Sequence, residues 1–244
     1  MDYKKMLINF FKEYGYEPEA YQIENILKFH HKAVEFNRHT NILGTKEPDE
    51  IFIRHFLDCL SVLELKTYFH PIVLKEKIML DLGTGGGFPG ILLAIIFNSN
   101  RFLLIEKSKK KSDFLINIIN ELKLENVEII SNQAEILARD LRYRGNIDYC
   151  FARAFANINI LLELITPFAK INGNLFFYKS RKIYEEISLT ESVMKELGIS
   201  VVLVKEVRVP FLEEFRAIEV LEKVSETPDK YPRSLSTIKK FIIQ

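Results

Sequence analysis

The chain of 244 residues has no tryptophan, only four methionines and only two cysteines. Cys59 and Cys150 are far apart in the sequence and belong to no Cys-x-x-Cys pair or Cys/His cluster. A disulfide framework and a structural zinc site both need several such residues at suitable spacings, so the sequence argues against both. We expect two reduced, buried thiols and no bound metal.

An excess of charge of one sign is also missing. Lys and Arg total 34 and Asp and Glu total 33, which gives a formal net charge of +1. The charge of the whole chain therefore neither indicates nor excludes a nucleic acid partner. A polyanion would have to be bound by a local basic patch.

Long apolar runs are absent as well. The nearest to one, residues 90–97, is less than half of the roughly 20 residues that cross a bilayer. Asn9, Lys12 and Glu13 interrupt the apolar residues near the N-terminus, so we expect no export signal. We expect a soluble, cytoplasmic protein without membrane contact. Hydrophobic residues still make up 48% of the chain, which is enough for a large core.

Residues 1–70 predict an N-terminal helical cap of about three helices. Apolar residues recur at helical spacing in residues 23–34 and 53–63, and strand-like alternation is absent. Pro18 and Pro48 each stand where a helix can begin.

Residues 71–244 predict an α/β unit, because β-rich runs alternate with helical ones from residue 78 onward. Lys109–Lys123 is one such helix, with an apolar stripe. The last two β-rich runs flank a turn with Pro210 and predict an antiparallel hairpin at the edge of a mostly parallel, seven-stranded sheet. The expected strands are Ile78–Leu82, Arg101–Glu106, Asn126–Ile130, Ile147–Phe151, Asn174–Lys179, Ser200–Val209 and Glu214–Val224.

The strongest local signal is a glycine-rich loop directly after the first expected strand, running from Asp81 to Gly90. Its Gly-x-Gly-x-x-Gly spacing, which includes Gly85, fits either a dinucleotide or S-adenosylmethionine. Asp81 ends the strand where it would repel a pyrophosphate and attract the cationic amine and sulfonium of the methyl donor. Glu106 ends the second strand, where a carboxylate can bind both ribose hydroxyls of either cofactor. These features favour the methyl donor over a dinucleotide or a purely structural glycine turn.

Several spaced motifs resemble the glucose-inhibited division protein B methyltransferases, which methylate N7 of a guanine in small-subunit (16S) ribosomal RNA. The resemblance covers nearly the whole chain and implies a Rossmann-like class I methyltransferase with S-adenosylmethionine as its cofactor. The motifs are Asn37–Leu43, Arg54–Leu60, Gly87–Gly90, Lys110–Lys111 with Phe114–Leu115, Gln133–Glu135, Ala152–Ala154 and Tyr231–Arg233.

The resemblance also implies which residues bind the methyl donor. They are Gly83, Phe88, Ala134, Glu135 and Arg153. The sequence departs from the family at Lys107, at Tyr178–Ser180 and in the tail after Arg233, where the usual Gly and Pro are missing. The tail difference bears only on how the C-terminus would contact RNA.

Methylation of guanine N7 needs no general base, since N7 carries an exposed lone pair and no proton has to leave. We therefore expect no catalytic acid, base or nucleophile. Other methylations require other residues. Methylation of a pyrimidine at carbon 5 generally needs a cysteine in a loop after the fourth strand, but Cys150 lies within that strand. Methylation of an exocyclic amine is typical of an Asn/Asp-Pro-Pro-Tyr/Phe motif, which is absent.

Cationic residues near the expected carboxyl ends of the strands and in the cap are the candidates for RNA contact. Each has a plainer alternative: the lysine run is often a solvated helix face, and His55 can be a structural histidine. The candidates are Arg38, His55, Lys109, Lys110, Lys111, Arg153 and Lys179.

The sequence thus predicts a monomeric methyltransferase that transfers a methyl group from S-adenosylmethionine to guanine N7 in ribosomal RNA or in the small ribosomal subunit. Two alternatives remain. One is a small-molecule methyltransferase on the same scaffold. The other is a ribosome assembly factor that binds S-adenosylmethionine without catalysis.

Overall fold

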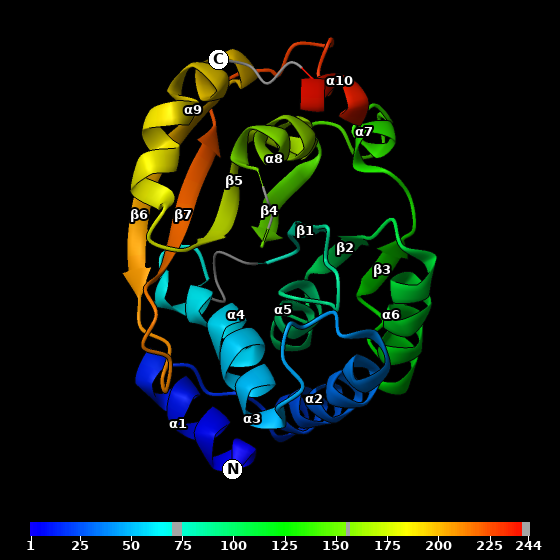
Figure 1. The fold of residues 1–244 in the computed structure, drawn as a ribbon, viewed down its shortest axis with the longest axis vertical. Helices are drawn as coiled ribbons and strands as arrows, with labels where there is room; N and C mark the ends of the chain where they lie inside the picture. The colour runs from blue at the N-terminus through cyan, green and yellow to red at the C-terminus, as the bar shows by residue number, and fades with distance from the viewer. Residues whose placement is uncertain (70–74, 155–156, 241–244) are drawn as a thin grey trace.

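The computed structural model describes residues 1–69, 75–154 and 157–240. The predicted boundary between residues 70 and 71 lies outside the described residues. Within the described part of the chain, no helix is long and apolar enough to cross a membrane. The N-terminus and α10 (Leu235–Lys240) lie at opposite ends of the molecule (Figure 1).

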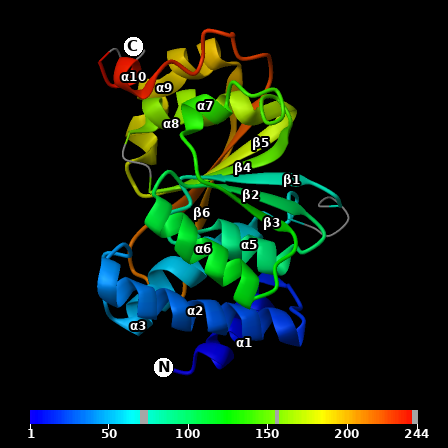
Figure 2. The same cartoon turned by 90° about the vertical axis from the view of Figure 1, so that its right-hand side faces the viewer.

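One sheet of seven strands crosses the middle of the described structure, in the order β3-β2-β1-β4-β5-β7-β6 (Figure 2). The first five strands are parallel, and β7 runs antiparallel to both β5 and β6. The predicted mostly parallel sheet with a C-terminal hairpin is confirmed. The strands are β1 (Ile78–Leu82), β2 (Arg101–Ile105), β3 (Val127–Ile130), β4 (Ile147–Arg153), β5 (Ala169–Lys179), β6 (Ile199–Val207) and β7 (Arg216–Lys223).

Two of these strands are longer than the sequence predicts. β4 continues through Arg153, and β5 begins at Ala169 rather than at Asn174. The sequence of the early part of β5 is typical of a turn, because it contains Asn172 and Gly173. In the structure Asn172 adopts a positive φ of 62°. Pairing of Ala169 with Ile147 nevertheless keeps this segment in the sheet, across a register shift.

Helices cover both faces of the sheet (Figure 2). On one face lie α5 (Gly90–Ile96) and α6 (Lys109–Glu121), with the N-terminal helices beyond them. On the other face lie α7 (Ala134–Leu137), α8 (Ile158–Ile165) and α9 (Ile183–Leu197), with α10 beside them. Cys59 and Cys150 are free and buried, as predicted, and they belong to two different hydrophobic clusters.

The predicted helical cap is confirmed. It consists of α1 (Tyr3–Tyr14), α2 (Ala20–Thr40) and a continuous run over residues 48–64. This run contains α3 (Pro48–Ile51), a π-helix (Phe52–Leu57), α4 (Asp58–Leu60) and a 3₁₀ turn (Ser61–Glu64).

The two predicted helix starts turn out differently. Pro48 is the first residue of α3, as expected. Pro18 does not begin α2, because Glu19 and Gln22 form a reciprocal capping box that starts the helix at Ala20.

The cap and the α/β unit share one hydrophobic core. The ring of Phe88, from the glycine loop, lies 5.1 Å from the rings of both Phe29 and Phe56 of the cap. The buried Gln22 side chain donates to the carbonyl oxygens of Ile95 and Ile96 at 3.0 and 2.9 Å. The inner face of the cap packs directly on α5 and on the glycine loop, so the cap is an integral part of the fold rather than an appended module.

We predict that Gln22→Leu lowers the free energy of unfolding by about 1–3 kcal/mol, because two carbonyl groups at the end of α5 lose a buried donor. Urea denaturation followed by circular dichroism measures the effect. Lys28→Ala, on the exposed side of the same helix, is the control and should leave the stability unchanged. A Gln22→Leu protein as stable as the wild type would contradict this role.

Candidate active site at the carboxyl ends of the strands

The strand order reverses between β1 and β4, because β2 and β3 follow β1 to one side while β4 and β5 lie on the other. In open α/β sheets the crevice at the carboxyl ends of two such strands is the usual ligand site. The glycine loop follows β1 at this edge, and Arg153 ends β4 beside it. Most of the predicted site residues are therefore brought to one edge of the sheet.

The glycine loop has the backbone that its sequence predicts. Gly83 and Gly85 adopt positive φ angles of 71° and 61°, which side chains strain. A Cβ atom built on Gly85 would find no atom closer than 3.8 Å, so this part of the loop is open. A Cβ atom on Gly87 would lie 2.8 Å from Ile91, so that glycine is required by packing.

Asp81 lies beneath the loop with only one of its oxygens bonded. Its Oδ2 accepts from the backbone N–H of Gly90 at 2.9 Å, whereas Oδ1 is buried without a hydrogen-bond partner among the described residues. The nearby Thr84 Oγ1 is also buried and unpartnered in the described structure. Burial raises the pKa of Asp81 to about 6. A cationic group close to Oδ1 would satisfy it, and this fits the ammonium end of S-adenosylmethionine.

Glu106 is held beside the loop by two backbone groups. Its Oε2 accepts from the N–H of Gly85 at 3.1 Å and its Oε1 accepts from the N–H of Ser108 at 2.8 Å. The carboxylate thus connects the glycine loop to the start of α6. Each oxygen still has a free lone pair, so the predicted contact with ribose hydroxyls fits this geometry.

The remaining predicted donor contacts lie around the same edge. Ala134 and Glu135 open α7 after β3 and are half-buried. Phe88 is different, since its ring is buried against the cap and lies 5.3 Å from the ring of His55. The ring of Phe88 is therefore turned into the core, and the donor contact that the resemblance implies at this position would involve the backbone.

Arg153 binds the cap. Its Nε donates to Asp58 Oδ2 at 3.1 Å, its Nη2 donates to the carbonyl oxygen of Arg54 at 2.6 Å, and its Nη1 lies 3.0 Å from His55 Nδ1. Arg216 of β7 lies 3.2 Å from the other oxygen of Asp58, without hydrogen-bond alignment. Asp58, Arg153 and Arg216, which we call the Asp58 cluster, join the cap to two strands at the edge of the site.

Both ring nitrogens of His55 are used within the protein. Nε2 lies 2.9 Å from the carbonyl oxygen of Leu43, which can only accept, so the proton is assigned to Nε2. Nδ1 then accepts from Arg153. Burial and the neighbouring Arg153 lower the pKa of His55 to about 4. The arrangement is that of a neutral structural histidine, and a direct contact with RNA would have to break one of these bonds.

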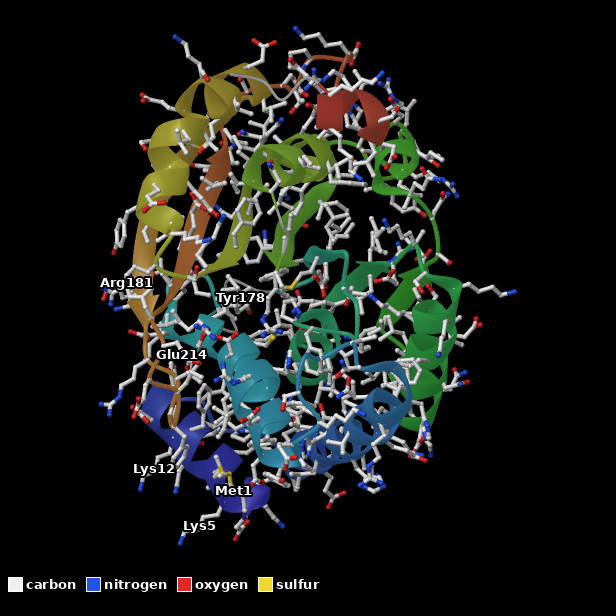
Figure 3. All side chains as sticks on the ribbon, viewed as in Figure 1. Met1, Lys5, Lys12, Tyr178, Arg181 and Glu214 are labelled. Atoms are coloured by element: carbon white, nitrogen blue, oxygen red, sulfur yellow. The ribbon has the colours of Figure 1, made fainter. Side chains whose placement is uncertain are left out.

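The other candidates for RNA contact fall into two groups. Arg38, Lys109 and Lys110 are exposed, Lys111 is half-buried, and none of the four has an ion pair among the described residues. Lys179 is instead enclosed: its Nζ lies 2.6 Å from Glu186 Oε2 and 3.7 Å from Glu219 Oε2. Figure 3 shows the neighbouring Tyr178 pointing into the molecule and Arg181 pointing outward.

Asp58, Arg216, Glu186 and Glu219 were not among the predicted site residues. A signal was present for two of them, because Asp58 and Glu219 each interrupt an apolar run, and a buried acid needs a cationic partner. The sequence does not reveal which cation is the partner. In the Tyr231–Arg233 motif, Arg233 forms a two-pronged ion pair with the buried Glu163 of α8.

Solved structures with a similar fold include S-adenosylmethionine-dependent methyltransferases. The chain superposes on such an enzyme from Aquifex aeolicus with a TM-score of 0.52 and 20% sequence identity, over 73% of this chain and 94% of that one. It superposes on TYW2 of M. jannaschii in complex with AdoMet with a TM-score of 0.50 and 18% identity, over 67% and 77% of the two chains. The fold is therefore that of the Rossmann-like class I methyltransferases.

The family is shown by sequence relatives. The model of the GidB family, described as rRNA small subunit methyltransferase G, matches residues 22–214. A Thermoanaerobacter pseudethanolicus protein named ribosomal RNA small subunit methyltransferase G is 36% identical over 236 residues, covering 97% of this chain and 96% of the relative. A protein of the same name from Fusobacterium nucleatum is 34% identical, with 88% of each chain covered. The chain belongs to the rRNA small subunit methyltransferase G family, as the resemblance indicated.

We predict that His55 makes the protein less stable in mild acid. The pKa of His55 is 6.5 in the unfolded chain and about 4 in the folded protein. The free energy of unfolding therefore falls as the pH drops from 6.5 to 4, and below pH 4 the effect of His55 no longer changes with pH. Between pH 7.5 and 5 the loss is up to about 2 kcal/mol. Urea denaturation of wild type and His55→Gln at several pH values isolates this contribution, because glutamine does not titrate.

The exposed His39 provides the control, and His39→Gln should keep the pH dependence of the wild type. If wild type and His55→Gln lose stability in parallel on acidification, His55 is not held in the neutral form.

Proposed function

We propose that this protein transfers a methyl group from S-adenosylmethionine to N7 of a guanine in small-subunit ribosomal RNA. The observation that carries the proposal is the edge at the carboxyl ends of β1, β2 and β4, where the open glycine loop, Glu106 and the half-bonded Asp81 lie together in a chain of this family. The reaction and the base come from the family, and the geometry provides a site suited to the donor.

The chain contributes binding and orientation. In this proposal the buried, unpartnered Asp81 Oδ1 and Thr84 Oγ1 receive the amino acid end of the donor, Glu106 binds the ribose, and the start of α7 with Ala134 and Glu135 binds the adenine. When bound, S-adenosylmethionine supplies an activated methyl group on a cationic sulfur. Alignment of N7, carbon and sulfur can then account for several kcal/mol of the rate enhancement.

No residue has to remove a proton in this reaction, because the N7 lone pair is free in guanine. His55 is occupied on both ring nitrogens, and burial raises the pKa of the Cys59 thiol well above its ordinary value. Among the described residues, no group of three or more His, Cys, Asp and Glu side chains could hold a metal ion. We further propose that the protein acts as a monomer in the cytoplasm.

Mass analysis of ribosomal RNA from cells with and without the gene tests the function. Loss of one 7-methylguanosine from 16S RNA is the expected result, restored by the wild-type gene. Unchanged RNA together with methylation of a small molecule would favour a small-molecule methyltransferase. Unchanged methylation together with defective subunits would favour an assembly factor.

We predict that Glu106→Ala raises the dissociation constant for S-adenosylmethionine at least tenfold, since charge-assisted hydrogen bonds contribute about 1.5–3 kcal/mol each. Glu106→Gln should have a milder effect. Titration calorimetry gives both constants, and thermal unfolding shows whether each variant is folded. Normal binding by both would mean that the ribose is held elsewhere.

The open glycine loop gives an independent test of the same site. Gly85→Asp should abolish cofactor binding and preserve the fold, because a charged side chain would enter the space next to the loop. Calorimetry with S-adenosylmethionine measures the effect. An affinity equal to that of the wild type would show that the donor does not approach Gly85.

Lys109, Lys110 and Lys111 open α6, where they add to the positive end of the helix dipole. Replacing all three by alanine should weaken RNA binding and flatten its dependence on salt, by up to ~0.7–0.9 in log–log slope per lost phosphate contact. Cofactor affinity should not change. Binding isotherms at several salt concentrations measure the slope, and an unchanged slope would identify the run as a solvated helix face.

A further inference from the structure

A cavity lies next to the proposed donor site, at the carboxyl ends of β4 and β5. It has a volume of about 290 Å³, close to the lower end of the range for small-ligand pockets. Arg153 and Ala154 line it at the end of β4, Lys179 and Ser180 at the end of β5, and Glu186 from α9. Because β4 separates this cavity from the glycine loop after β1, a group bound here would be one strand away from the methyl donor.

The polar part of this cavity is the pair of Lys179 and Glu186. The Lys179 ammonium donates to Glu186 Oε2 at 2.6 Å. Glu186 Oε1 has no hydrogen-bond partner among the described residues, and the side chain of Glu186 is 32% exposed while that of Lys179 is 11% exposed. The pair therefore presents a cationic donor and an adjacent carboxylate with one free oxygen.

A second acid, Glu219, lies near the Lys179 ammonium on the side away from the cavity. It lies on β7, opposite Phe177 of β5, with its side chain 3% exposed. Its Oε2 lies 3.7 Å from Lys179 Nζ and has no hydrogen-bond partner in the described structure. Burial raises the pKa of Glu219 to about 7. Glu186 and Glu219 thus both lie near the Lys179 ammonium. Only Glu186 lines the cavity, so Glu186 is the acid that can bind a ligand there.

The geometry points to Lys179 and Glu186 as the residues that recognise the Watson–Crick edge of the target guanine. This inference rests on the proposed function and names how the same site selects its base. Guanine presents an acceptor, O6, beside two donors, N1–H and N2–H. The ammonium can donate to O6 while the carboxylate accepts from N1–H and N2–H, and N7 lies on the other side of O6.

The same pair rejects adenine. Adenine presents a donor, its N6 amino group, where guanine has O6, and an acceptor, N1, where guanine has N1–H. The ammonium would meet the amino group and the carboxylate would meet the N1 lone pair, so each contact would be repulsive or unpaired. Recognition through this edge also requires that the guanine be unpaired, either in a loop or turned out of a helix.

Inosine separates base recognition from a structural role of Glu186. Inosine keeps N7, O6 and N1–H of guanosine but lacks the N2 amino group. Two forms of one short RNA, with guanosine or inosine at the methylated position, are compared in single-turnover assays with the wild type, Glu186→Ala and Glu186→Gln. Glu185→Ala is the matched control, since Glu185 is exposed on the same helix turn and does not bind Lys179.

We expect wild type and Glu185→Ala to methylate guanosine about tenfold more efficiently than inosine, the size of one lost contact to a base edge. Glu186→Ala should lose at least tenfold on guanosine and bring the ratio of guanosine to inosine close to one. Glu186→Gln, which keeps the size of the side chain and one acceptor oxygen, should lie between them.

Two results would overturn the inference. One is a wild type that methylates both RNAs equally. The other is a Glu186 variant that is slower on both RNAs but keeps the wild-type ratio, because Glu186 would then be structural. A wild type that methylates neither RNA nor the small ribosomal subunit, although it binds S-adenosylmethionine, would instead refute the proposed function.

Discussion

The buried carboxylate of Asp58 is the interaction on which the site depends. Its side chain is 4% exposed and lies between Arg153 of β4 and Arg216 of β7. Removing one member of such a cluster leaves an uncompensated charge and costs about 3–5 kcal/mol. Through Arg153 the cluster also positions His55, and through His55 the loop that contains Leu43. The cap therefore lies over the glycine loop in one fixed position, with Ile42 and Leu43 against Gly86.

The cationic side chains of the molecule serve two different purposes. Arg38 and the lysines that open α6 are mainly at the surface without recorded acidic partners in the described chain, so their field extends into solvent. Arg153, Arg216 and Lys179 lie at the site and are paired with nearby carboxylates, the two arginines with the same one, that of Asp58. Attraction of a polyanion is thus separated in space from the selection of a base. A net charge of +1 is compatible with both.

The sequence predicted the sheet well because its information is local. Each β-rich run, each intervening helix and the glycine loop can be recognised within about 15 residues, and the order of strands follows the family. The partners of charged residues cannot be recognised in this way. Arg153 and Asp58 are 95 positions apart, and Arg233 and Glu163 are 70 apart. For the same reason, Lys179 was predicted as an RNA contact without the two acids that enclose it, and His55 without the carbonyl oxygen that fixes its proton.

The common core of cap and sheet has a consequence for how the protein responds to its cofactor. Phe88 belongs to the glycine loop, yet its ring packs among Phe29 and Phe56 of the cap. Free energy gained when a ligand orders that loop is therefore transmitted to the helices that cover it, and the described parts should unfold together in one cooperative transition. Saturation with the methyl donor then protects the backbone amides of α2 from hydrogen exchange, although α2 contributes none of the proposed contacts with the donor.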